Sequence, residues 1–246
     1  MAKTLEGARC LVTGATSGIG KALADELAER GAVVVRASRP SARLDSLAIR
    51  GQPSLAFELS EPRSIGALFA QYRARHGTLD FLFHAAGTCF FGRVGEAPYR
   101  EVEGHFRVNA IGAILMLEEG RRLMRENPCG GTCVMLGSLA GAIDSPHPVE
   151  LAVYAAAKEA VAGYLRCVRP TLEVEGIRIL LACPGGVSTA ISRHSFGGAA
   201  LAQHMALCDL DDADTVARAI LDELEGPYFD GGLRILPSKA SRRYFE

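Results

Sequence analysis

Along the chain, short runs of apolar residues alternate with longer segments in which apolar residues recur at regular intervals. The first example has an apolar run over residues 8–13, then Ile19, Leu23 and Leu27 at intervals of four, and then a β-branched run over residues 33–35. A short apolar run is typical of a buried strand, and a spacing of four is typical of one face of a helix. The pattern therefore predicts a strand–helix–strand unit at the start of the chain.

The same alternation continues to the end of the chain. Further apolar runs cover residues 54–59, 79–83, 132–136, 177–182 and 233–236, and helix-length segments separate most of them. Strands that lack polar alternation are buried on both faces, and helical connections between them lead to parallel pairing. We therefore expect an α/β fold with a doubly wound, parallel sheet of about seven strands and helices on both faces. No linker or repeat divides residues 1–246, so we expect a single domain.

Residues 185–209 break this alternation, because they are glycine-rich at first and then only weakly periodic. A connection of this length in a compact domain is usually functional, so we expect it to form a substrate lid. Apolar side chains in the lid and after the fourth expected strand could line an apolar pocket, or could belong to the core or to a subunit interface. They are Ile191, Phe196, Leu201, Met205 and Leu207 in the lid, and Phe90 and Phe91 after the strand.

Composition narrows the classes of protein to consider. With 48% hydrophobic and 22% charged residues, the chain has a globular composition, which excludes a disordered or fibrous chain. The formal net charge of -1 gives no general basic surface for nucleic acid or an anionic membrane. The start lacks the apolar stretch of a secretory signal, and no apolar run approaches the roughly 18 residues of a spanning helix. We therefore expect a soluble protein without nucleic-acid or membrane partners.

The cysteines and histidines do not suggest a disulfide framework or a metal site. The seven cysteines are an odd number spread over a large domain, which is typical of reduced thiols and favours a cytoplasmic location. Cys129 and Cys133 have no matching second pair, and five of the histidines show no ligand spacing. These are His76, His105, His147, His194 and His204. We therefore expect no metal site.

Three glycines mark the loop between the first expected strand and the helix after it. Gly14, Gly18 and Gly20 stand in the sequence Thr-Gly-Ala-Thr-Ser-Gly-Ile-Gly. Free N–H groups at a helix start attract a pyrophosphate, and the absence of side chains lets the phosphates approach. The loop is therefore a candidate dinucleotide site, and a tight turn without a ligand is the alternative.

Tyr154 and Lys158 stand four residues apart in the helix-favouring sequence Val-Tyr-Ala-Ala-Ala-Lys-Glu-Ala, so both project from one helix face. The pKa of a phenol is about 10, and a neighbouring ammonium lowers it toward the range that is useful for proton exchange with a substrate oxygen. The pair is therefore a candidate acid/base couple, and a surface Tyr–Lys contact is the alternative.

Together with other residues in a fixed order, these motifs resemble those of the short-chain dehydrogenases/reductases, and the resemblance covers nearly the whole chain. The additional residues are Ala85-Ala86-Gly87 after the fourth expected strand, Asn109, Ser138 after the fifth, and Pro184-Gly185 after the sixth. The resemblance implies a Rossmann-type domain that holds NAD(H) or NADP(H) and transfers a hydride between the nicotinamide and a carbonyl or alcohol carbon. It also implies a homo-oligomer, either a dimer or a tetramer.

The resemblance assigns four catalytic roles. Tyr154 would protonate the carbonyl oxygen during reduction or deprotonate the alcohol during oxidation. Lys158 would lower the pKa of Tyr154 and hold the nicotinamide ribose. Ser138 would donate a hydrogen bond to the same substrate oxygen. Asn109 would kink its helix and seat a water molecule in a proton relay. Taken alone, Ser138 and Asn109 are more typical of cap or turn residues, and only the joint pattern favours the catalytic roles.

The end of the second expected strand favours NADP(H) over NAD(H). No carboxylate stands where an NAD-specific member would bind the ribose 2′-hydroxyl, and Ser38-Arg39 stands there instead. A guanidinium matches a 2′-phosphate, and Arg36 could assist it, although it could also point elsewhere. Glu58-Leu59 resembles the family's Asp-Val pair beside the adenine. The expected cofactor residues are Gly14, Ser17, Gly18, Ile19, Gly20, Ser38, Arg39, Glu58, Leu59, Ala85, Ala86, Gly87, Tyr154, Lys158, Pro184, Gly185, Val187 and Thr189.

Two features depart from the family pattern. His84 stands where the family usually has Asn, and an imidazole could replace the amide through one nitrogen, with pH sensitivity, or serve only as a structural residue. Gly231-Gly232 precedes the last expected strand, whereas many members have a similar motif after it. We therefore expect a divergent member.

The leading hypothesis is an NADP(H)-dependent oxidoreductase that acts on a small-molecule carbonyl compound or alcohol. Two alternatives remain open. The first is a catalytically silent sensor or scaffold that binds the dinucleotide. The second is an epimerase or eliminating enzyme on the same fold, which would consume no net NADPH.

Overall fold

The computed structural model describes residues 4–142, 148–226, 229 and 231–236. Seven strands form one parallel sheet with the order β3-β2-β1-β4-β5-β6-β7. They are β1 Arg9–Thr13, β2 Val33–Ser38, β3 Ser54–Ala56, β4 Phe81–His84, β5 Gly131–Leu136, β6 Ile177–Cys183 and β7 Gly232–Ile235. This arrangement confirms the prediction of a single Rossmann-type domain with a doubly wound parallel sheet.

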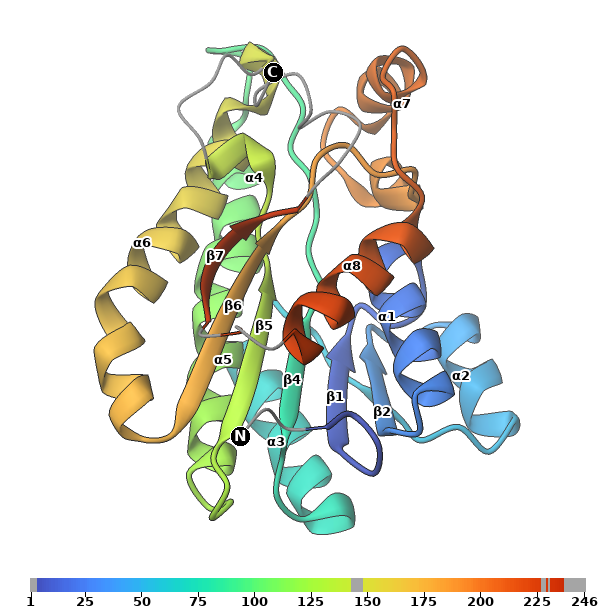
Figure 1. The fold of residues 1–246 in the computed structure, drawn as a ribbon. Helices are drawn as coiled ribbons and strands as arrows, with labels where there is room; N and C mark the ends of the chain where they lie inside the picture. Colours follow the sequence, from blue (N-terminus) through green and yellow to red (C-terminus); the bar gives the residue numbers. More distant parts are fainter. Residues whose placement is uncertain (1–3, 143–147, 227–228, 230, 237–246) are drawn as a thin grey trace.

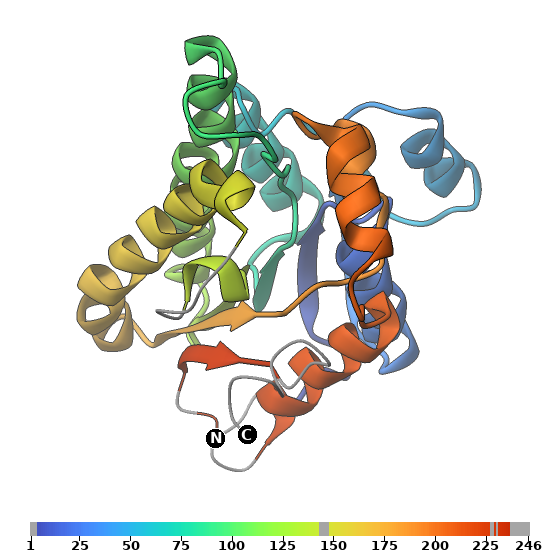
Figure 2. The same ribbon diagram turned by 90° about the horizontal axis from the view of Figure 1, so that it is seen from above.

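Helices cover both faces of the sheet (Figures 1 and 2). Their bounds are α1 Gly18–Glu29, α2 Ala42–Ile49, α3 Pro62–His76, α4 Tyr99–Phe106, α5 Ala113–Met124, α6 Ala152–Val174, α7 Gly198–Ala206 and α8 Ala213–Glu225. Four shorter pieces are the π-helical η1 Arg107–Gly112 and the 3-10 turns η2 Leu139–Gly141, η3 Val149–Leu151 and η4 Ala190–His194. Helices α1 and α8 pack on one face, and α3, α5 and α6 pack on the other.

The central strands β1, β2, β4, β5 and β6 each contribute to two separate hydrophobic cores, because successive side chains point to opposite faces of a sheet. In β1, Leu11 belongs to the core beneath α3, α5 and α6, whereas Val12 belongs to the core beneath α1 and α8. Both side chains are fully buried. Burial on both faces explains why the strands appear in the sequence as continuous apolar runs.

The carboxyl ends of the strands meet at one edge of the sheet, and the strand order reverses between β1 and β4 at that edge. Thr13, the last residue of β1, pairs in register with His84, the last residue of β4. In an open α/β sheet, ligands bind in the crevice outside such a switch point. The loops that follow β1, β4, β5 and β6 are therefore the part of the fold where a site is expected.

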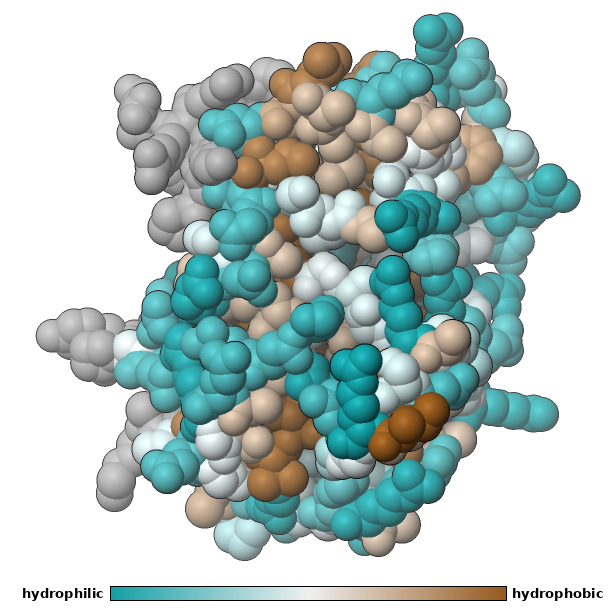
Figure 3. Space-filling model, turned by 90° about the vertical axis from the view of Figure 1, so that its right-hand side faces the viewer, coloured by the Kyte–Doolittle hydropathy of each residue, from teal (hydrophilic) through white to brown (hydrophobic). Residues whose placement is uncertain are grey.

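The surface over α1, α2, α7 and α8 is mostly hydrophilic, and apolar side chains gather on it at the end where α7 lies (Figures 1 and 3). Leu207, directly after α7, is 89% exposed. All seven cysteines are free thiols. Across the described parts of the chain, no helix has the length and apolar character needed to span a membrane.

Candidate active site

The glycine loop after β1 is shaped for close contact between backbones. Gly14 has a φ of 69°, in the left-handed region that favours glycine, and a Cβ there would lie 2.9 Å from the backbone N of Ala86. A Cβ on Gly20 would lie 2.5 Å from the carbonyl O of Gly14. Ser17 precedes α1 in an extended conformation, and its side chain makes no capping hydrogen bond. The helix N-terminus is therefore left to interact with an anion.

The end of β2 presents one exposed cation toward the same edge. Arg39 is exposed, and in the described part of the chain no carboxylate pairs with its guanidinium. The Ser38 hydroxyl lies 2.9 Å from the hydroxyl of Thr16 in the glycine loop. Arg36, in contrast, is only 4% exposed, pairs with Asp25 at 2.9 Å and donates to the backbone of α1. The expectation that Arg36 could assist Arg39 is therefore wrong, because strand alternation turns Arg36 toward α1.

The Glu58-Leu59 pair lies just after β3, which is shorter than expected. The carboxylate of Glu58 accepts hydrogen bonds from the backbone N and the hydroxyl of Ser60, at 3.3 and 3.1 Å. Leu59 is buried, and a Cβ on Gly112 would lie 2.7 Å from its carbonyl O. Glu58 therefore holds the turn into α3, and a role beside an adenine remains a prediction.

His84 is a buried structural residue at the end of β4. Its Nδ1 lies 2.9 Å from the hydroxyl of Thr13, which also accepts a hydrogen bond from the backbone N of Ala86 at 3.2 Å. Burial, and then the positive charge of Lys158, lowers the pKa of His84 to about 3. The imidazole is therefore neutral at ordinary pH, and the pH sensitivity considered for it is wrong. The bond to Thr13 orients Ala85, Ala86 and Gly87 against the glycine loop.

Tyr154 and Lys158 lie one turn apart at the start of α6, and both are partly buried. The Lys158 Nζ donates to the carbonyl O of Leu136 at 2.8 Å and lies 5.7 Å from the centroid of the Tyr154 ring. Burial lowers the pKa of Lys158 to about 8. Ser138 follows β5, caps η2 through its hydroxyl and lies close enough to Tyr154 to lower the pKa of the phenol.

Burial raises the pKa of Tyr154 above its ordinary value, and the nearby Ser138 hydroxyl opposes this effect only in part. The expected lowering of this pKa by Lys158 is therefore wrong. The reason is geometric: the ammonium is bound to the Leu136 carbonyl and lies over the phenol ring. The phenol consequently stays protonated at ordinary pH.

Asn109 lies in the π-helical segment η1 between α4 and α5, so the helix is locally distorted at this residue. Its Oδ1 accepts from the backbone N of Thr88 at 3.0 Å, and its Nδ2 donates to the carbonyl O of Thr88 at 2.6 Å. The same Nδ2 lies 2.9 Å from Nε2 of His105, one turn earlier. Asn109 therefore holds the loop after β4, and its part in a proton relay remains a prediction.

The loop after β6 brings the segment 185–209 onto the glycine loop. The carbonyl O of Pro184 accepts from the backbone N of Leu139, next to Ser138, at 2.9 Å. After Gly185, Val187 forms an isolated parallel bridge with Asp211. A Cβ on Gly18, which precedes Ile19 in α1, would lie 3.1 Å from the side chain of Thr189. The expected cofactor residues of β1 and β6 are thus neighbours in space.

Residues of the segment 185–209 pack against Tyr154 in a small apolar cluster. Buried Cys89 and Phe91, after β4, and Leu201, in α7, form its centre. The partly buried side chains packed against it are Leu151, Tyr154, Ile191 and Met205. Leu207 points to solvent instead, so its expected place in an apolar pocket is wrong.

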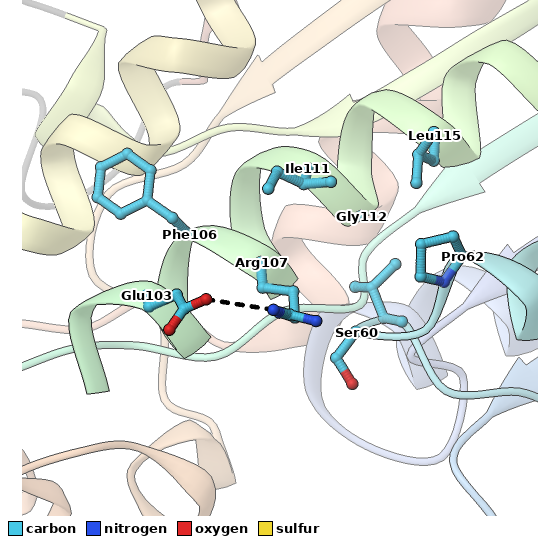
Figure 4. Close-up of a pocket in the computed structure, with 9 residues that line it drawn as sticks. Ser60, Pro62, Glu103, Phe106, Arg107, Ile111, Gly112 and Leu115 are labelled. Carbon is cyan, nitrogen blue, oxygen red and sulfur yellow. Dashed lines mark hydrogen bonds and ion pairs between the residues drawn. The ribbon is translucent and has the colours of Figure 1, made fainter. Parts of the chain in front are cut away.

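A pocket of about 350 Å³ lies beside these residues rather than among them (Figure 4). It is formed by the start of α3, by α4 and by η1 with α5, and Arg107 and Glu103 form an ion pair at 3.2 Å on its lining. Of the expected site residues, only Leu59 lines it. Within the described ranges no group of three or more His, Cys, Asp or Glu could hold a metal ion. His147 lies outside those ranges.

A family model described as short chain dehydrogenase matches residues 8–199. The chain belongs to the short-chain dehydrogenase/reductase family. Versicolorin reductase 1 of Aspergillus parasiticus is 31% identical to this family member, over 77% of this chain and 74% of the relative. The NADPH-dependent 1-acyldihydroxyacetone phosphate reductase of Saccharomyces cerevisiae is 33% identical, over 74% of this chain and 62% of the relative. A short-chain dehydrogenase from Streptomyces avermitilis has a similar fold, with a TM-score of 0.82, 23% identity and coverage of 98% and 91% of the two chains.

Sequence reasoning missed three residues of this short-chain dehydrogenase that contact the expected catalytic groups. Leu136 accepts from Lys158 through its backbone, Thr88 binds Asn109 through its backbone, and His105 contacts both Asn109 and Tyr154. Leu136 and Thr88 interact through their backbone atoms, so the identity of their side chains gave no signal in the sequence. The spacing of four between His105 and Asn109 was the available signal for the third residue.

Proposed function

We propose that this short-chain dehydrogenase is an NADP(H)-dependent oxidoreductase that reduces a carbonyl compound, or oxidises the corresponding alcohol. The observation that carries the proposal is the grouping of Ser138, Tyr154 and Lys158 at the carboxyl edge of the sheet. Ser138 lies close enough to Tyr154 to lower the pKa of the phenol, and Lys158 lies one helical turn away. The names of the two reductase relatives support the reductive direction.

The residues around the glycine loop fit an NADP(H) dinucleotide. The close backbone approach at Gly14 and the uncapped start of α1 suit a pyrophosphate. Arg39 is exposed and has no carboxylate partner within the described ranges, which suits a 2′-phosphate. Further expected contacts include those of Ser38, Leu59, Ala86, Val187 and Thr189. The bound cofactor supplies the hydride.

In the proposed reduction, the carbonyl carbon accepts a hydride and the carbonyl oxygen accepts the phenolic proton of Tyr154. Burial keeps Tyr154 protonated, which suits a general acid in this direction. The Ser138 hydroxyl donates to the same oxygen and stabilises the charge that develops on it. Lys158 holds the nicotinamide ribose through its ammonium, and Asn109 fixes the loop after β4.

Two further elements of the proposal concern the lid and the assembly. Residues 185–209 act as the substrate lid, and the packing of Leu201 and Ile191 around Tyr154 supports this role. The protein assembles as a dimer or tetramer, and the 52% exposure of Ile111 on η1 is consistent with a buried contact in the assembly. Sedimentation at several protein concentrations tests the assembly.

A panel of carbonyl compounds tests the proposed reaction. Phenanthrenequinone, tetralone and nitrobenzaldehyde are each offered with NADPH and with NADH, and loss of the reduced nicotinamide is followed by its absorbance. We expect turnover with NADPH to exceed turnover with NADH. Tight NADPH binding without any turnover would instead support a dinucleotide sensor. Product formation without net NADPH consumption would support an epimerase or an eliminating enzyme.

A further inference from the structure

We infer that His105 is a positioning residue, which fixes the Asn109 side chain by a hydrogen bond and links the lid to the ring of Tyr154. The inference rests on the proposed function, because it gives Tyr154 and Asn109 their importance. His105 lies in the last turn of α4 and is 4% exposed. It is the only buried residue of that helix. A buried imidazole at the end of an otherwise accessible helix needs a hydrogen-bond partner, and the partner is Asn109.

The hydrogen bonds around Asn109 define what His105 does. The backbone N of Thr88 can only donate, so it identifies the Oδ1 of Asn109, and the Nδ2 then faces the carbonyl O of Thr88 and Nε2 of His105. An amide nitrogen can only donate, so the ring nitrogen that it approaches must accept. Nε2 of His105 is the nearer at 2.9 Å and Nδ1 lies at 3.4 Å, so we assign the accepting role to Nε2 and the ring proton to Nδ1. Burial lowers the pKa of His105 to about 4, which keeps the ring in this neutral, accepting form.

The ring of His105 is also the middle member of an aromatic row. Its centroid lies 5.9 Å from the ring of Tyr154 and 5.8 Å from the ring of Phe90. Phe90 in turn stacks on Phe196, which lies between η4 and α7 in the lid, with centroids 4.5 Å apart. The row therefore runs without a gap from the lid to the phenol.

Hydrogen bonds beside the aromatic row also connect the loop after β4 to the lid. The Thr88 hydroxyl donates to His194, the Cys89 N donates to the hydroxyl of Ser195, and the Phe91 N donates to Phe196, at 2.7, 3.0 and 3.1 Å. Thr88 is thus bound on one side by the lid and on the other by Asn109. His105 connects these hydrogen bonds to the aromatic row. One of its nitrogens contacts Asn109, and its ring contacts the rings of Tyr154 and Phe90.

Two substitutions separate the accepting nitrogen from the bulk of the ring. His105→Phe keeps an aromatic ring but leaves one N–H of Asn109 without an acceptor, and His105→Gln supplies an oxygen acceptor at the end of a flexible side chain. His76→Phe is the matched control, because His76 also contacts a tyrosine ring, that of Tyr72, at 5.2 Å and at the opposite end of the sheet.

Turnover is measured with NADPH and whichever of phenanthrenequinone, tetralone and nitrobenzaldehyde the parent reduces fastest. We expect His105→Phe to lower kcat on the order of tenfold or more, because small misplacements of a reacting group are costly, and to leave KM for NADPH within about twofold. His105→Gln should recover most of kcat, and His76→Phe should match the parent. In an Asn109→Ala background, His105→Phe should have little further effect on kcat, because it acts through Asn109.

Equal losses in the Phe and Gln variants, a parental kcat in His105→Phe, or full additivity with Asn109→Ala would each overturn the inference. If His105→Phe does not fold, nitrogen NMR of histidine-labelled parent protein decides, with His105→Gln used for assignment. A proton on Nε2 of His105 would overturn the inference, and a proton on Nδ1 would support it. Full activity of Tyr154→Phe, or no turnover of any panel compound by the parent, would instead overturn the proposed function itself.

Discussion

Each end of the sheet buries a tyrosine against a histidine ring, but the two pairs have different electrostatic surroundings. At the amino end, Tyr72 lies 5.2 Å from His76, and at the carboxyl end Tyr154 lies 5.9 Å from His105, measured between ring centroids. Burial raises the pKa of both phenols. Within the described residues, the buried hydroxyl of Tyr72 has no hydrogen-bond partner, whereas Tyr154 has Ser138 close enough to lower the pKa of its phenol.

The cation near each tyrosine has a different kind of partner. At the amino end, Arg9 pairs with Asp80 at 2.9 Å, and Asn127 donates to the same carboxylate at 2.7 Å. At the carboxyl end, Lys158 is held by a backbone carbonyl, and no carboxylate of the described chain pairs with it. A partly buried ammonium without a counter-ion destabilises the fold. The comparison therefore indicates that the amino end is arranged for stability and the carboxyl end for chemistry.

The largest expected effect comes from removing each phenolic hydroxyl in turn. Tyr154→Phe should lower turnover by about 10³-fold, because it removes the proposed proton donor, and should leave NADPH affinity unchanged. Tyr72→Phe should leave turnover unchanged and should not lower stability, since the hydroxyl it removes is unpaired in the described structure. Steady-state kinetics and thermal unfolding of both variants check the contrast. Similar kinetics in the two variants would erase the functional difference between the two ends.

Lys158→Met probes the cation without a counter-ion. We expect turnover to fall by about 10²-fold and NADPH affinity to weaken, because the ribose loses its ammonium partner.

The pH dependence of the Lys158→Met comparison has a defined sign. The pKa of Lys158 falls from 10.5 to about 8 on folding, so above pH 8 the unfolded chain binds the proton more than the folded chain does. The parent should therefore gain stability relative to Lys158→Met as pH rises from about 8 to 10, while its turnover declines over the same range. Chemical unfolding and kinetics at matched pH values check both slopes. If the stability of the parent and of Lys158→Met changed with pH in the same way, Lys158 would not be a destabilising buried ammonium.

Asp80→Asn tests the amino end, where the counter-ion is present. The substitution leaves Arg9 without its charged partner, and we expect the free energy of unfolding to fall by about 2 kcal/mol. Turnover per folded molecule should not change. Urea unfolding measures the first quantity, and active-site-normalised kinetics measure the second. A large loss of kcat in folded Asp80→Asn would show that the amino end also serves the chemistry.

The smallest effect is expected at the exposed cation of the carboxyl end. Arg39→Asp should shift the ratio of kcat/KM for NADPH and NADH by about tenfold toward NADH, because a carboxylate repels a 2′-phosphate. Arg50→Asp, at the end of α2, introduces the same charge change at another exposed arginine and should leave the ratio unchanged. Equal ratios in Arg39→Asp and the parent would assign phosphate recognition to another residue.

The sequence predicts the fold well because buried parallel strands are continuous apolar runs and the helices between them are periodic. Boundaries are less accurate at β3, where the apolar run continues past Ala56 into a turn held by Glu58. Phe57 and Leu59 are buried without belonging to the strand, so burial and strand pairing do not coincide there.

The sequence predicts which positions belong to the candidate site. It does not predict the interactions that these residues make. The direction of Arg36 depends on which face of β2 carries α1, and the sequence alone does not define that face. The pKa of Tyr154 depends on burial and on the position of the Lys158 ammonium, which a backbone carbonyl determines. A spacing of four indicates that two side chains can meet, but it does not say what lies between their polar atoms.

The π-helical segment η1 also makes the candidate site sensitive to the number of residues between α4 and α5. Its hydrogen-bonding pattern accommodates one residue more than an α-helical turn does, between α4 and α5. Deleting one residue of Arg107–Gly112 other than Asn109 would let a regular helix run from α4 into α5, and would remove the local distortion at Asn109. Asn109 would then lose the distorted backbone from which it binds Thr88, although every expected catalytic side chain was still encoded. In this region, insertions and deletions are therefore more disruptive than substitutions.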